Sequence, residues 1–241
     1  MSFSNGIKAI FFDLDGTLRH SVPHSGDIFT NYVASLGLRV NYEDRVRAMR
    51  WEYLYWANSA DLRDDLLAHS SDTENFWIEY SRRRLIVLGV SPALAVELSR
   101  KVSLHMGEEY KPESIVLEDV RRALVELQQS GYLMAVLSNR DKPFHETLEK
   151  HSIHEFFVFS LAAGEVDSYK PEPGLFEHAL KRAGLSAQEA VYVGDNYFAD
   201  VVGSRRAGLR PVLYDPDIIF PDADCATIRS FDELNSIVKS I

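Results

Sequence analysis

The sequence contains a single cysteine, Cys225, among its 241 residues. An internal disulfide, a paired-cysteine metal site and a dithiol redox centre are therefore excluded. A reducing compartment is the natural setting for such a chain, and we expect a cytoplasmic location. Long apolar runs are also missing. The run near the N-terminus is broken by Asp13, so we expect neither a signal peptide nor a membrane span there.

Basic residues are fewer than acidic residues. Lys and Arg number 26 against 36 Asp and Glu, which gives a formal net charge of −10. This charge repels nucleic acids and anionic membrane surfaces, and we expect neither as a partner. Hydrophobic residues make up 46% of the chain, enough to bury the core of one large or two modest domains. The composition therefore indicates a soluble globular protein.

Short apolar runs alternate with helical segments in two parts of the chain. Residues 7–12 are almost entirely apolar, as in a strand covered on both faces of a parallel sheet. Similar runs follow at 132–137, 156–159, 190–193 and 211–214. Helical spacing of apolar residues is found at 118–129 and 174–183. This alternation predicts an α/β fold with a Rossmann-like parallel sheet and helices on both faces.

Strand-like runs disappear between residues 21 and 112, where long amphipathic segments replace them. The last of these segments begins with Ser91 as its N-cap and Pro92 at the first helical position. The expected helices are 27–36, 43–59, 73–88 and 92–109. We therefore predict a Rossmann-like catalytic core of residues 1–20 and 113–241, with an inserted helical domain of residues 21–112.

Four carboxylates follow the ends of expected strands: Asp13, Asp15, Asp195 and Asp200. Ligands of open parallel sheets bind beyond the carboxyl ends of the strands, so we expect these side chains at one edge. Two like charges 4 Å apart repel by about 4 kcal/mol at an effective dielectric constant of about 20, and a cation is needed to compensate. Oxygen ligands without nearby His or Cys select a hard ion. Mg²⁺ suits a site that keeps room for water and a phosphate oxygen.

A hydroxyl and an ammonium are expected at the same edge. Ser138 and Asn139 follow the strand at 132–137, and Lys170 lies in a loop before the last two strands. A metal ion, a lysine and a hydroxyl together are suited to binding a phosphoryl group.

Four segments in this order resemble the motifs of the haloacid dehalogenase superfamily of hydrolases. They are DLDGTL from Asp13, SN from Ser138, KP from Lys170 and GDNYFAD from Gly194. The resemblance spans the chain. The helical insertion is similar to the helical cap of the branch that includes phosphoglycolate phosphatases, β-phosphoglucomutases and dehalogenases. The resemblance implies a Mg²⁺-dependent phosphatase that hydrolyses a small phosphorylated metabolite.

The resemblance also implies roles for the carboxylates. Asp13 would be the nucleophile that forms an aspartyl-phosphate. Asp15 would be the general acid and base, a task for which its pKa should be raised toward the working pH. Mg²⁺ would be bound by Asp13, Asp195 and the backbone carbonyl of Asp15. Asp200 would support the metal site through water or by orienting the other ligands.

The remaining motif residues would hold the phosphoryl group. Ser138 would bind its oxygens, and Lys170 would neutralise the charge that it shares with the nucleophile. The backbone amides of three further residues would complete this phosphate site: Gly16, Thr17 and Asn139.

Other residues have simpler interpretations. His20 and His24 have helical spacing for a metal pair, but Pro23 disfavours that helix; His24 is expected in a linker, and His20 close enough to the site to contact substrate. The basic run 82–84 is expected on a solvated helix face. An aromatic cluster is expected to pack the core of the helical domain: Trp51, Tyr53, Tyr55, Trp56, Phe76, Trp77 and Tyr80.

Alternatives to this phosphatase stay open. Arg19, His20 and Ser21 stand where many phosphoglycolate phosphatases have an apolar residue, Asp and Ser, which argues against that particular substrate. A dehalogenase of this superfamily would lack Asp15. A sugar phosphomutase would use the same residues, and a non-catalytic binding protein is a third possibility. The sequence identifies neither the substrate nor the oligomeric state.

Overall fold

The computed structural model describes residues 6–241, and the chain divides into two compact units. The first, called here the core unit, comprises the chain up to His20 and from Ile115 to Ile241. The second, called the helical unit, is Ser21–Ser114. Residues 1–5, which the domain prediction places in the core, lie outside the described part of the chain.

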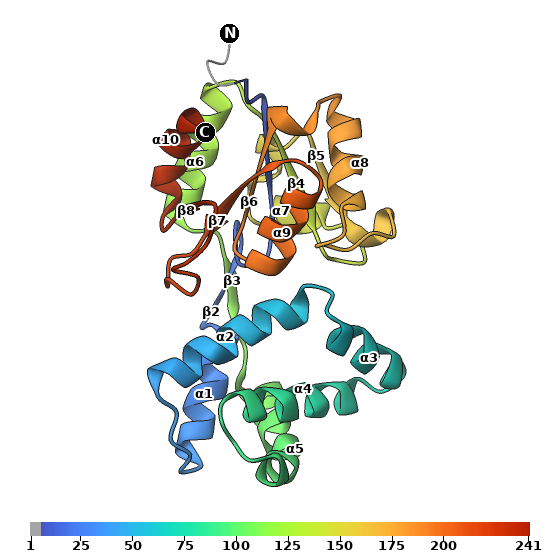
Figure 1. Cartoon of the computed structure of the whole chain (residues 1–241), viewed down its shortest axis with the longest axis vertical. Helices are drawn as coiled ribbons and strands as arrows, with labels where there is room; N and C mark the ends of the chain where they lie inside the picture. Colours follow the sequence, from blue (N-terminus) through green and yellow to red (C-terminus); the bar gives the residue numbers. More distant parts are fainter. Residues whose placement is uncertain (1–5) are drawn as a thin grey trace. The chain divides into compact units, whose positions relative to one another are not determined.

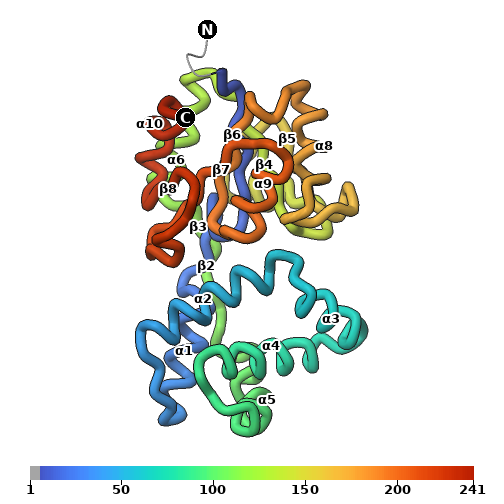
Figure 2. Tube along the Cα trace, viewed as in Figure 1, coloured from blue at the N-terminus to red at the C-terminus, as the bar shows by residue number. Residues whose placement is uncertain are grey.

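A six-stranded parallel sheet forms the centre of the core unit, in the order β5-β4-β1-β6-β7-β8 (Figure 1). The strands are β1 (Ala9–Phe12), β4 (Leu133–Ser138), β5 (Phe159–Ala162), β6 (Ala190–Gly194), β7 (Arg210–Tyr214) and β8 (Ala226–Ile228). In Figure 2, the blue N-terminal strand β1 runs among strands from the second half of the chain. This arrangement confirms the predicted parallel α/β sheet.

Helices cover both faces of this sheet because the side chains of each strand point alternately to opposite sides. Ile10 and Phe12 pack in one apolar cluster with residues of α6 (Glu118–Gln129) and α10 (Leu234–Ser240). Ala9 and Phe11 pack in another, with residues of α8 (Gly174–Ala183). Two short helices complete the core unit: α7 (His145–Lys150) and α9 (Val202–Arg206). The predicted helices 118–129 and 174–183 are confirmed.

The helical unit contains five helices within the described residues. They are α1 (Ser25–Ser35), α2 (Tyr42–Trp56), α3 (Ala60–Ala68), α4 (Thr73–Val87) and α5 (Pro92–Glu109). The single helix predicted over 43–59 ends early, because Asn58 adopts a left-handed conformation and Ser59 caps the separate helix α3. Of the aromatic residues expected in the core of this unit, Tyr55, Phe76 and Tyr80 are buried and Trp51 packs against them, whereas Trp56 and Trp77 are 37% and 44% exposed. The ring centroids of Tyr55 and Tyr80 lie 5.3 Å apart.

Two short strands stand at the ends of the insertion. They are β2 (His20–Val22) and β3 (Glu113–Ile115), which pair as a separate two-stranded sheet. None of the helices in residues 6–241 combines the length and the apolar character that crossing a bilayer requires.

The expectation of a solvated basic run at residues 82–84 is wrong for Arg84, which is 2% exposed. Its guanidinium pairs with Glu52 of α2 at 3.0 Å, donates to the Tyr80 hydroxyl at 3.1 Å and lies over the Phe29 ring of α1. The carboxylate on a neighbouring helix makes this burial possible, since a buried charge needs a partner. Arg84 therefore joins three helices of the unit.

Removal of the Glu52 carboxylate leaves the Arg84 charge buried and unpaired. We expect Glu52→Ala to lower the free energy of unfolding by about 3–5 kcal/mol. All three tryptophans of the chain, Trp51, Trp56 and Trp77, lie in the helical unit, so their fluorescence during urea unfolding reports on this unit.

The matched control is Glu74→Ala. It removes the partner of Arg100 in an ion pair whose side chains are 59% and 62% exposed, and it should cost less than about 1 kcal/mol. Equal effects of the two substitutions would show that the Arg84 pair contributes no more than a surface pair.

Candidate active site

Asp13 stands at the carboxyl end of β1, the strand that lies between β4 and β6. Its backbone amide donates to the Val193 carbonyl at 2.9 Å, so that the pairing with β6 continues one residue beyond the strand. The side chain is buried. The backbone of Asp13 is therefore fixed at the end of the central pairing between β1 and β6, and this positions its carboxylate.

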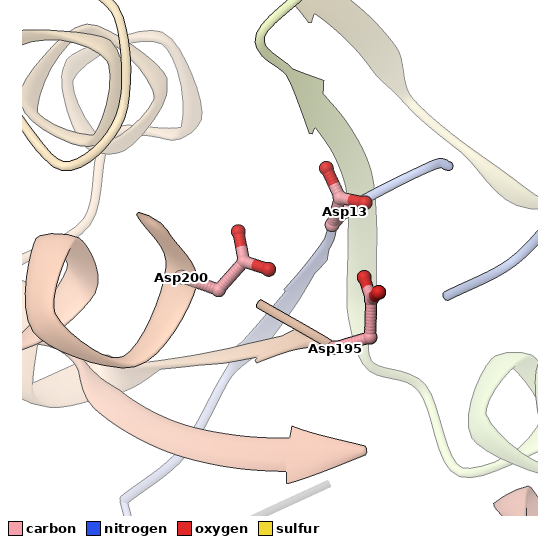
Figure 3. A group of neighbouring side chains, drawn as sticks. All are labelled: Asp13, Asp195 and Asp200. Atoms are coloured by element: carbon pink, nitrogen blue, oxygen red, sulfur yellow. The ribbon is translucent and has the colours of Figure 1, made fainter. Parts of the chain in front are cut away.

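Two more carboxylates approach Asp13. Asp195 follows β6 directly, and Asp200 lies in a π-helical turn, Tyr197–Val201. The structure brings one oxygen from each of the three side chains within 4.8 Å of the others (Figure 3). Asp13 and Asp200 are buried, whereas Asp195 is partly exposed. This group contains three of the four carboxylates that the sequence singles out.

The turn after β1 fits closely around Asp195. The Thr17 hydroxyl donates to Asp195 Oδ1 at 2.9 Å and accepts from the Asp195 backbone amide at 3.0 Å. Gly16 adopts a φ of +95°, and a Cβ added to it would overlap the Asp195 carboxylate. Only glycine permits this approach of the backbone. In this structure the side chain of Thr17, together with the absence of one at Gly16, sets the position of Asp195.

Lys170 brings the compensating charge. Its ammonium is buried and donates to Asp13 Oδ1 at 2.6 Å, to Asp200 Oδ1 at 2.7 Å and to the Tyr192 hydroxyl at 2.9 Å. Burial opposes the charged form, but the two carboxylates outweigh it and hold the pKa of Lys170 well above its ordinary value. Lys170 is therefore positively charged.

Asn139 holds the main chain of the same lysine. Its side-chain amide donates to the Lys170 carbonyl at 2.9 Å and its carbonyl oxygen accepts from the Lys170 amide at 2.7 Å. The sequence prediction uses only the backbone amide of Asn139, so this contact of its side chain is new. Ser138, the residue before Asn139, is the last residue of β4 and is buried.

The three carboxyl groups face one ammonium, so that their charge is compensated only in part. Burial raises the pKa of Asp13 to about 7, with Lys170 opposing and Asp200 reinforcing the shift. Burial and repulsion from Asp13 and Asp200 raise the pKa of Asp195 well above its ordinary value. A hard divalent cation fits this all-oxygen set and would remove the imbalance.

Asp15 is bound differently. Its Oδ2 accepts from Arg140 Nε at 2.8 Å, and its Oδ1 accepts from Arg140 Nη2 at 2.9 Å and from Arg19 Nη1 at 2.6 Å. Burial opposes ionisation, yet these guanidinium groups outweigh it and lower the pKa of Asp15. The expectation of a raised pKa is wrong for this structure. The carboxylate of Asp15 is also outside the group formed by the other three.

The two histidines occupy separate places. The Nε2 of His20 lies 3.1 Å from the Thr17 carbonyl, and its ring packs edge-on against Tyr214. His24 is the N-cap of α1, where its Nδ1 accepts from the Gly26 amide at 3.1 Å. The two therefore do not act as the metal pair that their spacing allows.

The sequence prediction misses two kinds of residue at this site: the arginines that bind Asp15 and the tyrosine that contacts Lys170. Arg19 and Arg140 stand beside motif residues, but a single arginine in a loop carries no signal of its partner. Tyr192 does carry one, because a phenol in the middle of a fully buried strand needs a hydrogen-bonding partner for its hydroxyl.

Comparisons with known proteins give the following likenesses. The model of the haloacid dehalogenase-like hydrolase family matches residues 7–208. A phosphoglycolate phosphatase of Vibrio cholerae is 29% identical over 208 residues, which cover 84% of this chain and 81% of that protein. Human haloacid dehalogenase-like hydrolase domain-containing protein 3 is 26% identical over 235 residues, which cover 98% of this chain and 91% of that protein.

Solved structures resemble this fold over nearly its whole length. The crystal structure of a predicted phosphoglycolate phosphatase from Haemophilus somnus gives a TM-score of 0.59 at 21% identity. The match covers 98% of this chain and 99% of that one, and shows that the two share a fold.

Mg²⁺ should stabilise the protein more at high pH than at low pH. Folded Asp13 keeps its proton up to about pH 7, whereas an unfolded Asp loses it near 3.8. The free energy of unfolding without metal therefore falls as the pH rises between these values. Because the cation binds ionised carboxylates, its increase in Tm should be larger at about pH 8 than at about pH 5. An equal increase at both pH values, or an unchanged increase in Asp195→Asn, would contradict this metal site.

Gly16→Ala tests the close approach of the turn to Asp195. The new Cβ displaces the Asp195 carboxylate, so most of the Mg²⁺-induced increase in Tm should be lost. Gly131→Ala is the matched control. Gly131 has a similar φ of +84°, but a Cβ added there would meet open space. Both variants lose about 1–2 kcal/mol from backbone strain. Only the control should keep the response to Mg²⁺, and loss of the response in both would assign the effect to strain.

Proposed function

The chain belongs to the haloacid dehalogenase-like hydrolase family, and on that premise we propose that it is a Mg²⁺-dependent phosphatase of a small phosphorylated metabolite. One observation carries the proposal. The buried Asp13 carboxylate at the end of β1 is hydrogen-bonded to Lys170 and lies in one group with Asp195 and Asp200. The name of the Vibrio cholerae relative supports a phosphatase.

Asp13 is the nucleophile of this proposal. Lys170 holds Asp13 Oδ1, and the free Oδ2 attacks the phosphorus atom. The bond from oxygen to phosphorus forms as the bond from phosphorus to the leaving oxygen breaks, which yields an aspartyl-phosphate and an alcohol. Water then attacks the same phosphorus and restores the carboxylate with release of inorganic phosphate. Covalent catalysis thereby divides one difficult displacement into two easier ones.

Asp15 is the proposed general acid and base. It gives a proton to the leaving oxygen in the first step and takes one from water in the second. Both of its oxygens are occupied by guanidinium groups in this structure. The proposal therefore requires that Arg19 or Arg140 releases an oxygen of Asp15 when the substrate binds, and that this oxygen takes up a proton from water before the first step. The second step then returns a proton to Asp15 for the next cycle.

The phosphoryl oxygens are proposed to bind the Ser138 hydroxyl and the backbone amides of Gly16, Thr17 and Asn139. Lys170 neutralises the charge that develops between Asp13 and the phosphoryl group. All of these residues follow strands of the sheet or belong to the loops at its carboxyl edge, apart from Ser138, which is the last residue of β4.

Asp13 and Asp195, with the backbone carbonyl of Asp15, are proposed to hold Mg²⁺, and Asp200 supports them. When bound, Mg²⁺ supplies positive charge that offsets the carboxylates and polarises a phosphoryl oxygen. Asp200 accepts from Lys170 through Oδ1 and from the Asn196 amide through Oδ2. Its support therefore consists largely of holding Lys170.

The helical unit is proposed to act as the cap that selects the leaving group. Its insertion point supports this role, because the insertion begins only a few residues after the proposed nucleophile and acid. A cytoplasmic location belongs to the same proposal and rests on the composition of the chain. A sugar phosphomutase stays as the second candidate, since the same residues would return the phosphoryl group to a sugar.

Phosphate release from a panel of sugar, nucleotide and organic-acid phosphates tests this function. We expect release from a few members with Mg²⁺ and none with excess chelator. Asp13→Asn should abolish release and keep the folded state, whereas Asp15→Asn should abolish turnover but keep the Mg²⁺-induced increase in Tm. Interconversion of isomeric sugar phosphates without net release of phosphate would replace the phosphatase by the mutase.

A further inference from the structure

The ammonium of Lys170 has three N–H groups and three strong acceptors around it. Two of these acceptors are Asp13 and Asp200, members of the carboxylate group that is suited to a cation. The third is the hydroxyl of Tyr192, at 2.9 Å. A fourth oxygen, the Leu137 carbonyl, lies at 3.4 Å and is therefore a much weaker contact.

The direction of the hydrogen bonds at Tyr192 follows from its two neighbours. The Leu137 carbonyl lies 3.1 Å from the phenolic oxygen and can only accept, so the hydroxyl proton is directed there. The ammonium of Lys170 can only donate, so it must meet a lone pair of the same oxygen. Tyr192 therefore acts as an acceptor toward Lys170, and its hydroxyl is fixed in one orientation.

The ring of Tyr192 is fixed as well. The residue lies in β6 with 1% of its surface exposed, and its ring packs edge-on against Phe176 of α8 at a centroid distance of 4.9 Å. Its hydroxyl reaches the carbonyl of Leu137 in β4, although β1 lies between β4 and β6 in the sheet. The phenolic oxygen is thus held by the sheet itself and by the helix that covers it.

Tyr192 differs from the other two acceptors in its charge. Asp13 and Asp200 are carboxyl groups, and in the proposed reaction Asp13 is converted into an acyl phosphate in each cycle. The phenol is neutral throughout, and its place in the sheet does not depend on the metal site or on the substrate. It can therefore hold the ammonium while the charges around it change.

We propose that Tyr192 is a positioning residue for Lys170, whose ammonium it keeps in line with Asp13 during the reaction. The inference rests on the proposed function, in which Lys170 neutralises the charge on Asp13 and the phosphoryl group. Tyr192 itself touches neither group in this role and acts only through the lysine.

Tyr192→Phe tests the proposal, because it removes the hydroxyl and keeps the ring. We expect kcat to fall by about 10–100-fold, the range known for residues that hold the ligands of a catalytic metal through hydrogen bonds. KM and the Mg²⁺-induced increase in Tm should change little. Tyr132→Phe is the matched control, since it removes a hydroxyl from a buried tyrosine that precedes β4 at the opposite edge of the sheet, and it should leave kcat unchanged.

The Lys170→Met background separates positioning from a general structural effect. There, the added Tyr192→Phe change should have no further effect on the residual rate. A similar fall in kcat in both backgrounds, or a kcat for Tyr192→Phe within about twofold of the wild type, would overturn the proposal. If the Phe variant does not fold, 3-fluorotyrosine at position 192 keeps the hydroxyl but weakens it as an acceptor, and a smaller fall in kcat is expected.

A crystal structure of Tyr192→Phe gives a measurement that does not depend on activity. Loss of the phenolic hydroxyl removes one of the three close acceptors of the ammonium and the hydroxyl that donates to the Leu137 carbonyl. The contact between the ammonium and this carbonyl should therefore shorten from 3.4 Å to about 2.9 Å. An unmoved Nζ would overturn the role of Tyr192. A wild-type protein that releases no phosphate would overturn the proposed function, while the position of Nζ would still decide the role of Tyr192.

Discussion

The buried contact between the Lys170 ammonium and the carboxylates of Asp13 and Asp200 is the interaction on which the site depends. A lysine that is 2% exposed is stable only if its charge is compensated, and both carboxylates have the same need. The compensation is incomplete, because a third carboxylate, Asp195, belongs to the group. Burial, reinforced by repulsion among the carboxylates, raises the pKa values of Asp13 and Asp195. The remaining negative charge is suited to a hard cation.

The order of the sheet explains how residues so far apart in the chain meet. Because β1 pairs with both β4 and β6, the residues after these three strands gather around Asp13. The supporting contacts come from residues in or after the same strands: Thr17, after β1, donates to Asp195, and Asn139, after β4, holds the main chain of Lys170. Tyr192, within β6, accepts from the Lys170 ammonium. The turn after β1 also needs glycine at position 16, because any side chain there would overlap the Asp195 carboxylate. Parallel pairing of the strands thus brings segments that are distant in the sequence together at one site.

Much of the core could be predicted from the sequence because its signals are local. An apolar run such as 7–12 identifies a buried strand, and β1 lies within it. Features that depend on a distant partner could not be predicted. The burial of Arg84 depends on Glu52, 32 residues earlier, and the lowered pKa of Asp15 depends on Arg140, 125 residues later. The strand expected at 156–159 begins only at Phe159, because a 3₁₀ turn, His154–Phe156, occupies the start of that run. Apolar composition alone does not distinguish the two.

The pairing of β2 with β3 determines which changes of sequence and length the insertion can accommodate. These strands stand at the two ends of the helical insertion, so the insertion leaves and rejoins the core unit at neighbouring positions. A segment with adjacent ends can be lengthened, shortened or exchanged without altering the register of β1 against β4 and β6. Every residue proposed to take part in the chemistry lies outside this segment. The length and sequence of the helical unit can therefore change while the sheet and the proposed catalytic residues stay as they are, so that one chemistry can be combined with different helical segments.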